Sequence, residues 1–521
     1  RYIFSENTGV VVIPEGTTEI SARAFSGQAS MTKLVIPESI QVLGDYAFQG
    51  CWNLKEVAFN NGSPSLAAIP AYAFANCLAL TSVVIPEGVV SIGEGAFMNC
   101  VALTSVSMGD LVASVGDYAF RSTASLNRIT LPSNLKTIGK NLFNDSGLTS
   151  VEIPASVTSI ADEAFAGAAL KTVTFAAGSS LTTIGKNAFA GSDIESIAIP
   201  AKVTTIGVNA FESCTSLREA VFEGTGKIKS IPEYCFSGCT ALEGIDIPEG
   251  VTGICQYAFY GCEKLSSLTL PSTLKMIGTE VSPTNKTTTS PYKGHVFDYC
   301  SSLTSVEFPD ALEFIAPWSF ARTGLTSVKL PASLKYLCTR PMLPVATLTN
   351  NITRTLTDTS TYLSSQFAYC ENLTEAILPK GLVALGGRVF NGCINLKNVV
   401  YEGYTGTGSA LPNTVQTIAG CAFMGLEITE LTVEAVTTLG NYAFCDMPAL
   451  QTITFAPDCK AKTLGNYSMA YNPLLESVTL PQKLTSIGTY VFYEDAALAS
   501  IELPDTVVKT GDYVFAYTAL R

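Results

Sequence analysis

Apolar and polar residues along this chain follow one arrangement that recurs about every 23 residues. It is clearest in residues 80–103, LTSVVIPEGVVSIGEGAFMNCVAL, and it returns in residues 148–165 as LTSVEIPASVTSIADEAF. Each copy carries one phenylalanine, here called the motif phenylalanine, such as Phe97, Phe165 and Phe189. Because a unit this short cannot bury its own apolar face, the pattern predicts coils that stack on one another around one continuous core.

The pattern within one repeat predicts the elements of a coil. Apolar residues alternate with polar ones in residues 82–85 and 150–153, as in a strand with one buried face. The proline that follows cannot donate to a ladder and ends the strand. Val-x-x-Ile-Gly predicts a second short extended piece, and the segment around the motif phenylalanine predicts a single helical or 3-10 turn. We therefore expect an α/β solenoid of about twenty 23-residue coils with short parallel strands, in one elongated domain over residues 1–521.

The repeat L-x-x-V-x-I-P-x-x-V-x-x-I-G-x-x-A-F-x-x-C resembles the BspA-like, or Treponema pallidum-type, leucine-rich repeat over essentially the whole chain. The resemblance implies a leucine-rich-repeat solenoid that is secreted or anchored to the outer surface of a gut or oral anaerobe. Some members of the family are adhesins for host matrix or plasma proteins, and the family supplies no catalytic residues. Met469 departs from the pattern because it replaces one motif phenylalanine.

The sequence begins and ends close to the boundary of a repeat. The chain begins at Arg1 and enters a repeat almost at once, so we expect an upstream segment such as a signal peptide or lipid anchor. It stops at Arg521 as another repeat would begin, and no C-terminal cap is visible in the sequence.

Charge and hydropathy narrow the range of partners. The chain has 31 Lys and Arg against 44 Asp and Glu, a net charge of −13, and no basic cluster. Nucleic acid and anionic membrane surfaces are therefore unfavourable partners. Apolar runs stay well short of the roughly 18 residues of a spanning helix, so we expect no membrane-spanning segment.

The 15 cysteines suggest a disulfide framework at first, but their positions favour another interpretation. Many lie three residues after the motif phenylalanine, where a small apolar group turns inward, as at Cys51, Cys100 and Cys214. Parallel side chains in adjacent coils are about 4.8 Å apart, beyond the roughly 3.5 to 4.5 Å that a disulfide prefers between Cβ atoms. We predict free thiols in the core. With no CxxC pair and one histidine, neither a metal site nor a cofactor is expected.

Three steps between motif phenylalanines are too long and indicate insertions at residues 279–296, 338–366 and 402–412. The first two leave the coil at the same point of the repeat, one ordinary repeat apart, so we expect them to emerge on one edge and to touch. The third leaves after the strand, on a different edge. Such insertions either mark a binding face or are drift in tolerated surface loops.

Aromatic residues recur two positions before the motif phenylalanine. The set comprises Tyr46, Tyr72, Tyr118, Tyr234, Tyr257, His295, Trp318, Tyr442, Tyr467, Tyr490 and Tyr513. Stacked rings at this spacing either buttress the coils or present a surface that contacts sugar or protein. The candidate binding residues are Tyr257, Tyr292, His295, Trp318 and Tyr362, which lie in this column or in the first two insertions. No motif fixes a nucleophile or carboxylate beside His295, so no catalytic residue is nominated.

The outward positions of the strands are small and polar, as at Ser105, Ser150 and Glu152. This surface is either a docking face or an ordinary solvated one. Together these features favour a non-enzymatic bacterial surface protein, a monomer that binds a host extracellular protein or glycan as an adhesin does. The alternative is a structural stalk that displays another domain. An enzyme is disfavoured because metal spacing, a phosphate loop and a nucleophile elbow are all missing from the sequence.

Overall fold

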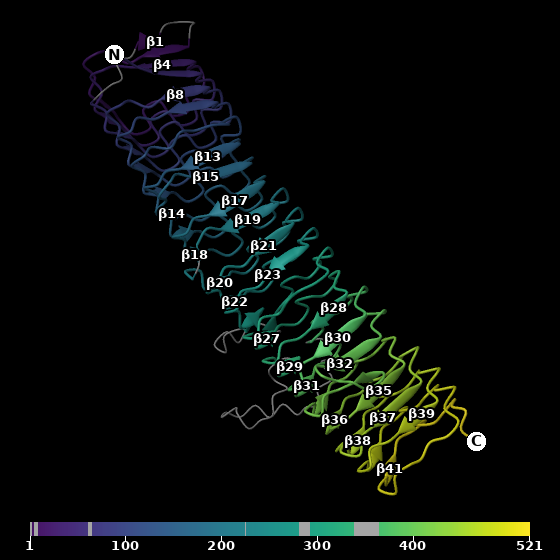
Figure 1. Cartoon of the computed structure of the whole chain (residues 1–521). Helices are drawn as coiled ribbons and strands as arrows, with labels where there is room; N and C mark the ends of the chain where they lie inside the picture. The colour runs from purple at the N-terminus through teal and green to yellow at the C-terminus, as the bar shows by residue number, and fades with distance from the viewer. Residues whose placement is uncertain (1–2, 5–8, 61–64, 225, 281–291, 338–363) are drawn as a thin grey trace, which may run out of the picture. The chain divides into compact units, whose positions relative to one another are not determined.

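The structure is a computed structural model that describes residues 3–4, 9–60, 65–224, 226–280, 292–337 and 364–521. They fall into two compact units, Arg1–Pro248 (unit 1) and Glu249–Arg521 (unit 2). In each unit, coils with two short strands follow one another along the chain, and equivalent strands of successive coils lie side by side (Figure 1). The parallel strands and the stacked coils predicted from the repeat are confirmed within each unit.

The first strand of each coil forms the surface here called the strand face. In unit 1 these strands are β1 (Ile3–Phe4), β2 (Val10–Val12), β4 (Lys33–Ile36), β6 (Glu56–Phe59), β8 (Ser82–Val84), β10 (Ser105–Ser107), β13 (Ser150–Ile153), β15 (Thr172–Phe175), β17 (Ser196–Ile199), β19 (Glu219–Phe222) and β21 (Gly244–Asp246). In unit 2 they are β23 (Ser267–Thr269), β28 (Ser327–Lys329), β30 (Glu375–Leu378), β32 (Asn398–Tyr401), β35 (Glu430–Val433), β37 (Thr452–Phe455) and β39 (Ser477–Thr479). The coil of β32 adds a second strand to this face, β33 (Ser409–Ala410). Apart from β1, which runs antiparallel to β2, the paired strands of this face are parallel.

The second strand of each coil has two residues. In unit 1 these are β3 (Glu19–Ile20), β5 (Val42–Leu43), β7 (Ala68–Ile69), β9 (Ser91–Ile92), β11 (Ser114–Val115), β12 (Thr137–Ile138), β14 (Ser159–Ile160), β16 (Thr183–Ile184), β18 (Thr205–Ile206) and β20 (Ser230–Ile231). In unit 2 they are β22 (Gly253–Ile254), β24 (Met276–Ile277), β27 (Phe314–Ile315), β29 (Tyr336–Leu337), β31 (Ala384–Leu385), β34 (Thr417–Ile418), β36 (Thr438–Leu439), β38 (Thr463–Leu464), β40 (Ser486–Ile487) and β41 (Lys509–Thr510).

A parallel register places identical positions of successive coils together. Val151 of β13 pairs with Val173 of β15, and both side chains are buried, while Ser150 and Glu152 are exposed. The alternation predicted for the strand is therefore confirmed. The outward positions form the polar surface expected from the sequence.

The motif phenylalanines stack face to face through the core. In unit 1, successive ring centroids from Phe25 to Phe236 lie 5.2 to 5.7 Å apart. In unit 2, Phe259, Phe297 and Phe320 continue the same arrangement at 5.2 Å. These distances fall in the range that aromatic pairs favour, and the fully buried rings form the continuous core that the repeat predicts.

The cysteines lie where the repeat predicts them. The described cysteines are free thiols, and nearly all are buried. The Cys100 thiol donates to the carbonyl oxygen of Phe74 in the preceding coil, 3.2 Å away, and Cys214 donates likewise to Phe189. Burial raises the pKa of the Cys100 thiol to about 12, so this sulfur stays protonated and inert.

The segment around each motif phenylalanine, here called the motif turn, differs from the expectation. The helical or 3-10 turn predicted there is not confirmed, because the described motif turns are chains of hydrogen-bonded turns. Residues two before and two after the phenylalanine have positive φ, such as 59° at Tyr46 and 60° at Asn76. A left-handed residue on each side of the phenylalanine interrupts any run of right-handed helical residues.

Two predicted insertions begin at equivalent points, after β24 and after β29. The first opens as a hairpin in which β25 (Thr279–Glu280) pairs antiparallel with β26 (Tyr292–Lys293). The predicted contact between the two insertions lies outside the described residues. The third insertion, 402–412, starts where β32 ends and returns to the strand face as β33, which pairs with β35.

Candidate functional site

The motif turns of unit 2 are held in place by a ladder of main-chain hydrogen bonds. Tyr257, Phe259 and Gly261 donate their amides to the next described coil, at Gly294, Val296 and Asp298, over 2.9 to 3.0 Å. Because alternate amides are tied to the neighbouring coil, the residues two before and two after the phenylalanine keep fixed directions. These two positions carry the candidate site.

Four aromatic side chains stack along this surface of unit 2. The Tyr257 and His295 rings lie 4.9 Å apart, and the His295 and Trp318 rings lie 5.8 Å apart, each pair within 7° of parallel. Tyr369 extends the stack, with its ring 6.2 Å from Trp318. It comes from the position after the phenylalanine, because Ser365 occupies the position before it in that coil. We call these four rings the aromatic column.

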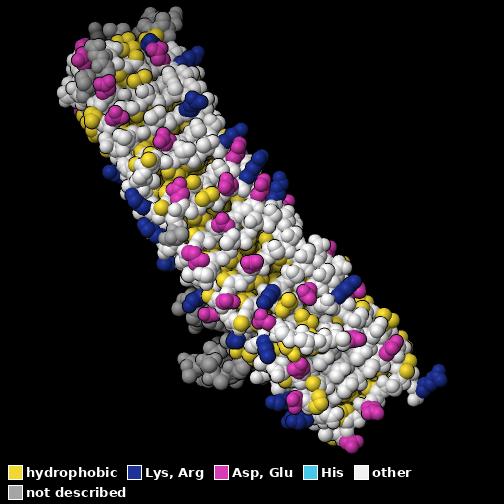
Figure 2. Space-filling view, viewed as in Figure 1, with side chains coloured by type: hydrophobic (Ala, Val, Ile, Leu, Met, Phe, Trp, Pro, Cys, Tyr) yellow, Lys and Arg dark blue, Asp and Glu magenta, His cyan; other side chains and the backbone are white. Residues whose placement is uncertain are grey.

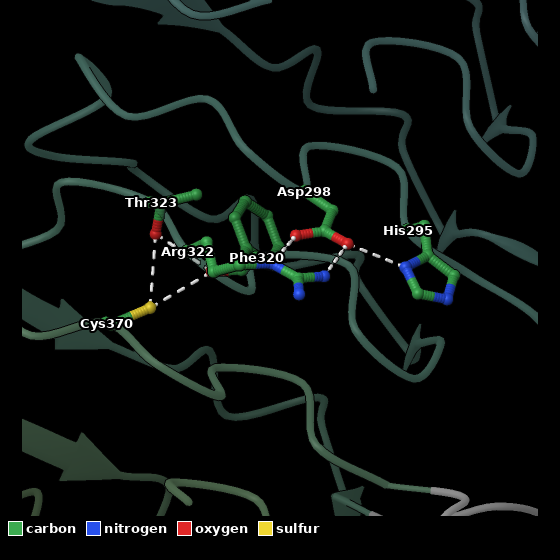
Figure 3. Close-up of polar contacts among 6 residues, drawn as sticks. All are labelled: His295, Asp298, Phe320, Arg322, Thr323 and Cys370. Carbon is green, nitrogen blue, oxygen red and sulfur yellow. Dashed lines mark hydrogen bonds and ion pairs between the residues drawn. The ribbon is translucent and has the colours of Figure 1, made fainter. Parts of the chain in front are cut away.

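A buried carboxylate binds two of the side chains at the aromatic column. The Asp298 side chain is fully buried, and its Oδ2 lies 2.7 Å from Nδ1 of His295 (Figure 3). Arg322 approaches the same carboxylate, donating from Nε to Oδ1 over 2.8 Å and from Nη2 to Oδ2 over 2.5 Å. A buried charge is tolerated only when it is paired and hydrogen-bonded. Asp298 therefore fixes the orientation of the imidazole and of the guanidinium at once.

Arg322 also packs on aromatic rings. Its Cζ lies 4.0 Å from the centroid of Tyr299 and 5.4 Å from that of Trp318. Desolvation of Arg322 acts to lower its pKa, but the hydrogen bonds and charge of Asp298 outweigh this and raise the pKa above its ordinary value. The guanidinium thus stays charged while it binds the carboxylate and stacks on rings.

A second row of rings flanks the aromatic column. Tyr260 meets Tyr257 and Tyr299 edge to face, with both centroid distances 5.6 Å. Burial, and then the charge of Asp298, raise the pKa of Tyr260, so its hydroxyl is a neutral donor at physiological pH. Tyr299 and Tyr369 remain 42% and 43% exposed, and they are the rings that a partner can reach.

A shallow depression of about 430 Å³ opens beside Tyr369. It is lined by Ser301, Arg322, Thr323, Gly324, Tyr369, Glu371 and Asn372. Its floor is held by Thr323, whose hydroxyl donates to the Phe320 carbonyl over 2.9 Å and lies 3.2 Å from Cys370 Sγ. The depression thus combines an exposed ring with charged and amide groups on a rigid base.

The structure brings together three of the five residues that the sequence singles out. Tyr257, His295 and Trp318 stack in the aromatic column. Tyr292 lies in β26, and Tyr362 lies outside the described residues.

The sequence pattern missed Asp298, Tyr299, Arg322 and Tyr369. Three of these residues lie two positions after a motif phenylalanine, and this column carries a signal of its own because Tyr471 and Tyr517 share it. Asp298 has no such signal, since nothing in the repeat shows that a carboxylate next to the phenylalanine turns inward.

The described residues contain no cluster of three or more His, Cys, Asp or Glu side chains suited to hold a metal ion. Nor does this part of the chain contain a helix that is long and apolar enough to cross a membrane.

The fold and the stacked motif turns define a repeat protein of the leucine-rich type, a class whose coils present extended surfaces. The family model for the BspA type leucine-rich repeat region matches six copies over residues 2–66, 67–192, 182–288, 292–407 and 401–521. The chain belongs to this family, and the resemblance seen in the sequence is confirmed.

Several solved structures are similar to this chain. A leucine-rich repeat protein from Bacteroides ovatus is 21% identical, with a TM-score of 0.43, and the alignment covers 84% of each chain. One from Eubacterium ventriosum is 23% identical, with a TM-score of 0.41, covering 63% of this chain and 85% of the other. A leucine-rich cell surface protein from Faecalibacterium prausnitzii is 20% identical, with a TM-score of 0.35, covering 77% and 93%. No curated protein matches the chain.

Proposed function

We propose that this chain is a non-enzymatic surface binding protein of a bacterium, an adhesin that recognises a host extracellular protein or glycan through the aromatic column of unit 2. The observation that carries the proposal is the buried Asp298, which fixes His295 and Arg322 beside the exposed rings of Tyr299 and Tyr369. A repeat that needed only to stack has no use for a buried carboxylate at this position.

The composition of the surface suits protein recognition in particular. Trp, Tyr and Arg are the residues that most often dominate binding energy at protein interfaces. Their rings here are rigid before binding, because each is stacked on a neighbour or on a guanidinium. A surface ordered in advance loses little side-chain entropy when a partner docks.

The charge of the chain supports a partner that is neither nucleic acid nor an anionic membrane. Acidic and basic side chains are interspersed over the face in view (Figure 2), and the net charge is −13. The first two insertions begin in the coils that carry His295 and Tyr369, so they are proposed as flanking parts of the same site. Secretion or surface anchoring, and a monomeric state, belong to this proposal.

The proposal is tested by probing arrays of host matrix proteins, plasma proteins and glycans with the purified chain. A matched pair of variants then locates the contact. Tyr369→Ser removes an exposed ring of the aromatic column. Tyr471→Ser removes a ring at the equivalent position of another coil. The two side chains are similarly exposed, Tyr369 at 43% and Tyr471 at 38%. Both residues have positive φ, 58° and 61°, so the backbone cost of the two changes is alike.

We expect a specific partner whose affinity falls at least about tenfold with Tyr369→Ser, as for an interface hot spot, and is unchanged with Tyr471→Ser. Absence of any partner on the arrays would favour a structural stalk. A partner that binds both variants as tightly as the unmodified chain would place the contact elsewhere.

A further inference from the structure

The strand face of unit 1 is interrupted at one coil. β10 ends one sheet, where its register partner is β8, and β13 begins the next sheet, where its partner is β15. Residues 126–131, between them along the chain, occupy the place of a first strand but form none. The second strands break at the same level, because β11 and β12 belong to different sheets.

The interrupted coil leaves main-chain donors without carbonyl partners. Its flanks are attached, since Ser125 donates to Val101 and Thr149 donates to Asn127, both over 3.2 Å. Between these points, the amides of residues 128–130 donate to no carbonyl of the described main chain. Polar main-chain groups need a partner, so these amides are available to water or to a ligand.

A depression of about 640 Å³ lies at this interruption. Such a volume falls within the roughly 300 to 1,000 Å³ of small-molecule sites. At its base, Ile129 is partly exposed, whereas the equivalent Val106 and Val151 are 9% and 4% exposed. The coil therefore offers an apolar patch that its neighbours bury.

The rim is polar and carries no net charge. It carries the hydroxyls of Thr104, Ser105, Thr130, Ser150, Thr172 and Thr174 and the amide of Asn127. One cation, Arg128, and one anion, Glu152, also line it, both exposed and neither in an ion pair among the described residues. Arg128 and the free amides donate, Glu152 and Asn127 accept, and the lining has no net charge.

We propose that this depression binds a neutral oligosaccharide. Sugar hydroxyls donate and accept at once, which matches a rim of paired donors and acceptors, and the carbon face of a sugar ring suits the patch at Ile129. Because Arg128 and Glu152 balance each other, the lining gives no preference for a carboxylated sugar over a neutral one. An added peptide strand has no slot, because residues 126–131 already lie between β10 and β13. The site belongs to unit 1 and does not depend on the aromatic column.

The test is titration of the full chain with maltotetraose, cellotetraose and a mannotetraose, with binding measured by calorimetry or ligand-observed NMR. An oligosaccharide that contains glucuronic acid serves as the charged comparison. Arg128→Ala with Glu152→Ala removes the strongest donor and acceptor from exposed positions without touching the core. Arg218→Ala with Glu219→Ala is the matched control, because these exposed residues lie on an uninterrupted coil of the same face.

We expect at least one neutral tetrasaccharide to bind, with affinity lowered about tenfold or more in the first double variant, since hydrogen bonds to charged groups are stronger than those to neutral groups. The control should bind as the unmodified chain does. Failure of every neutral sugar to bind, preference for the glucuronic acid compound, or equal binding by the two double variants would overturn the proposal.

Discussion

At the residue level, each buried motif phenylalanine stabilises its coil by stacking on the rings of the neighbouring coils. Phe189 is fully buried, with its ring 5.2 Å from Phe165 and 5.4 Å from Phe211. Phe189→Ala leaves a cavity between two rings, so we expect the free energy of unfolding to fall by about 3 to 5 kcal/mol. Chemical denaturation measures the loss. Lys186→Ala, at an exposed position of the same coil, is the control, and an equal effect from both changes would contradict the account of the core.

One core position holds a carboxyl group in place of a thiol. Asp495 is fully buried, its Oδ1 accepts from the Asn472 amide over 2.8 Å, and its Oδ2 has no hydrogen-bond partner among the described residues. Burial raises the pKa of Asp495 to about 8, although the hydrogen bond from Asn472 acts to lower it. The folded chain therefore keeps a proton that the unfolded chain loses near pH 4.

This difference makes stability depend on pH. Stability falls as the pH rises from about 4 to about 8, by up to about 1.4 kcal/mol for each pH unit, and levels off above that range. Asp495→Asn keeps the acceptor for Asn472 but cannot ionise, so the decline between pH 5 and pH 8 should largely disappear. Melting temperatures of both proteins across this range measure it, and an unchanged pH profile in the variant would show that Asp495 is not the responsible group.

At the scale of the element, the motif turn depends on left-handed residues. Asn187 has φ of 52° two residues before Phe189. Asn187→Val puts a β-branched residue where φ is positive, at a cost of roughly 1 to 2 kcal/mol or more, whereas Asn187→Gly fits without strain. Unfolding experiments on both variants give the comparison, and equal stability of the two would mean that the turn can adopt another conformation.

The strands could be predicted from the sequence and the motif turn could not, for a physical reason. Alternation of Val and Ile with Ser and Thr specifies a half-buried strand directly. In the motif turn, left-handed positions are filled by Tyr46 and Trp318 as well as by asparagines such as Asn76 and by glycines, and a tyrosine or tryptophan gives no sign of positive φ in the sequence. Stacking of each ring on the next coil offsets the backbone cost, and this compensation exists only once coils are assembled.

Some residues of the candidate site could likewise be predicted from the sequence and others could not. Tyr257, His295 and Trp318 were accessible to sequence reasoning because they repeat at one position of the motif. Asp298 was not, since it acts by turning inward. Tyr369 was missed although its position repeats, because it joins the stack from a different position of its coil. Periodicity predicts what every coil shares, while the chemistry of a site lies in departures from it.

Across many coils, the repeat places side chains at equivalent positions next to one another, so that they form extended surfaces within each unit. The motif turns gather the aromatic column, and the strand face gathers small polar residues. A net charge of −13 disfavours nucleic acid as a partner, so the proposed recognition rests on rings and hydrogen bonds. We propose that a host partner contacts the motif turns of unit 2 between residues 256 and 372.

Amide hydrogen exchange of the full chain, free and bound to the partner found on the arrays, locates this contact. Protection on binding should concentrate in residues 256–261, 294–301, 317–324 and 366–372, whose amides lie beneath the aromatic column. The turns at 442–447 and 467–472, which carry a similar row of tyrosines, should be unchanged. Protection confined to those later turns or to the strand face, with none at the aromatic column, would contradict the account.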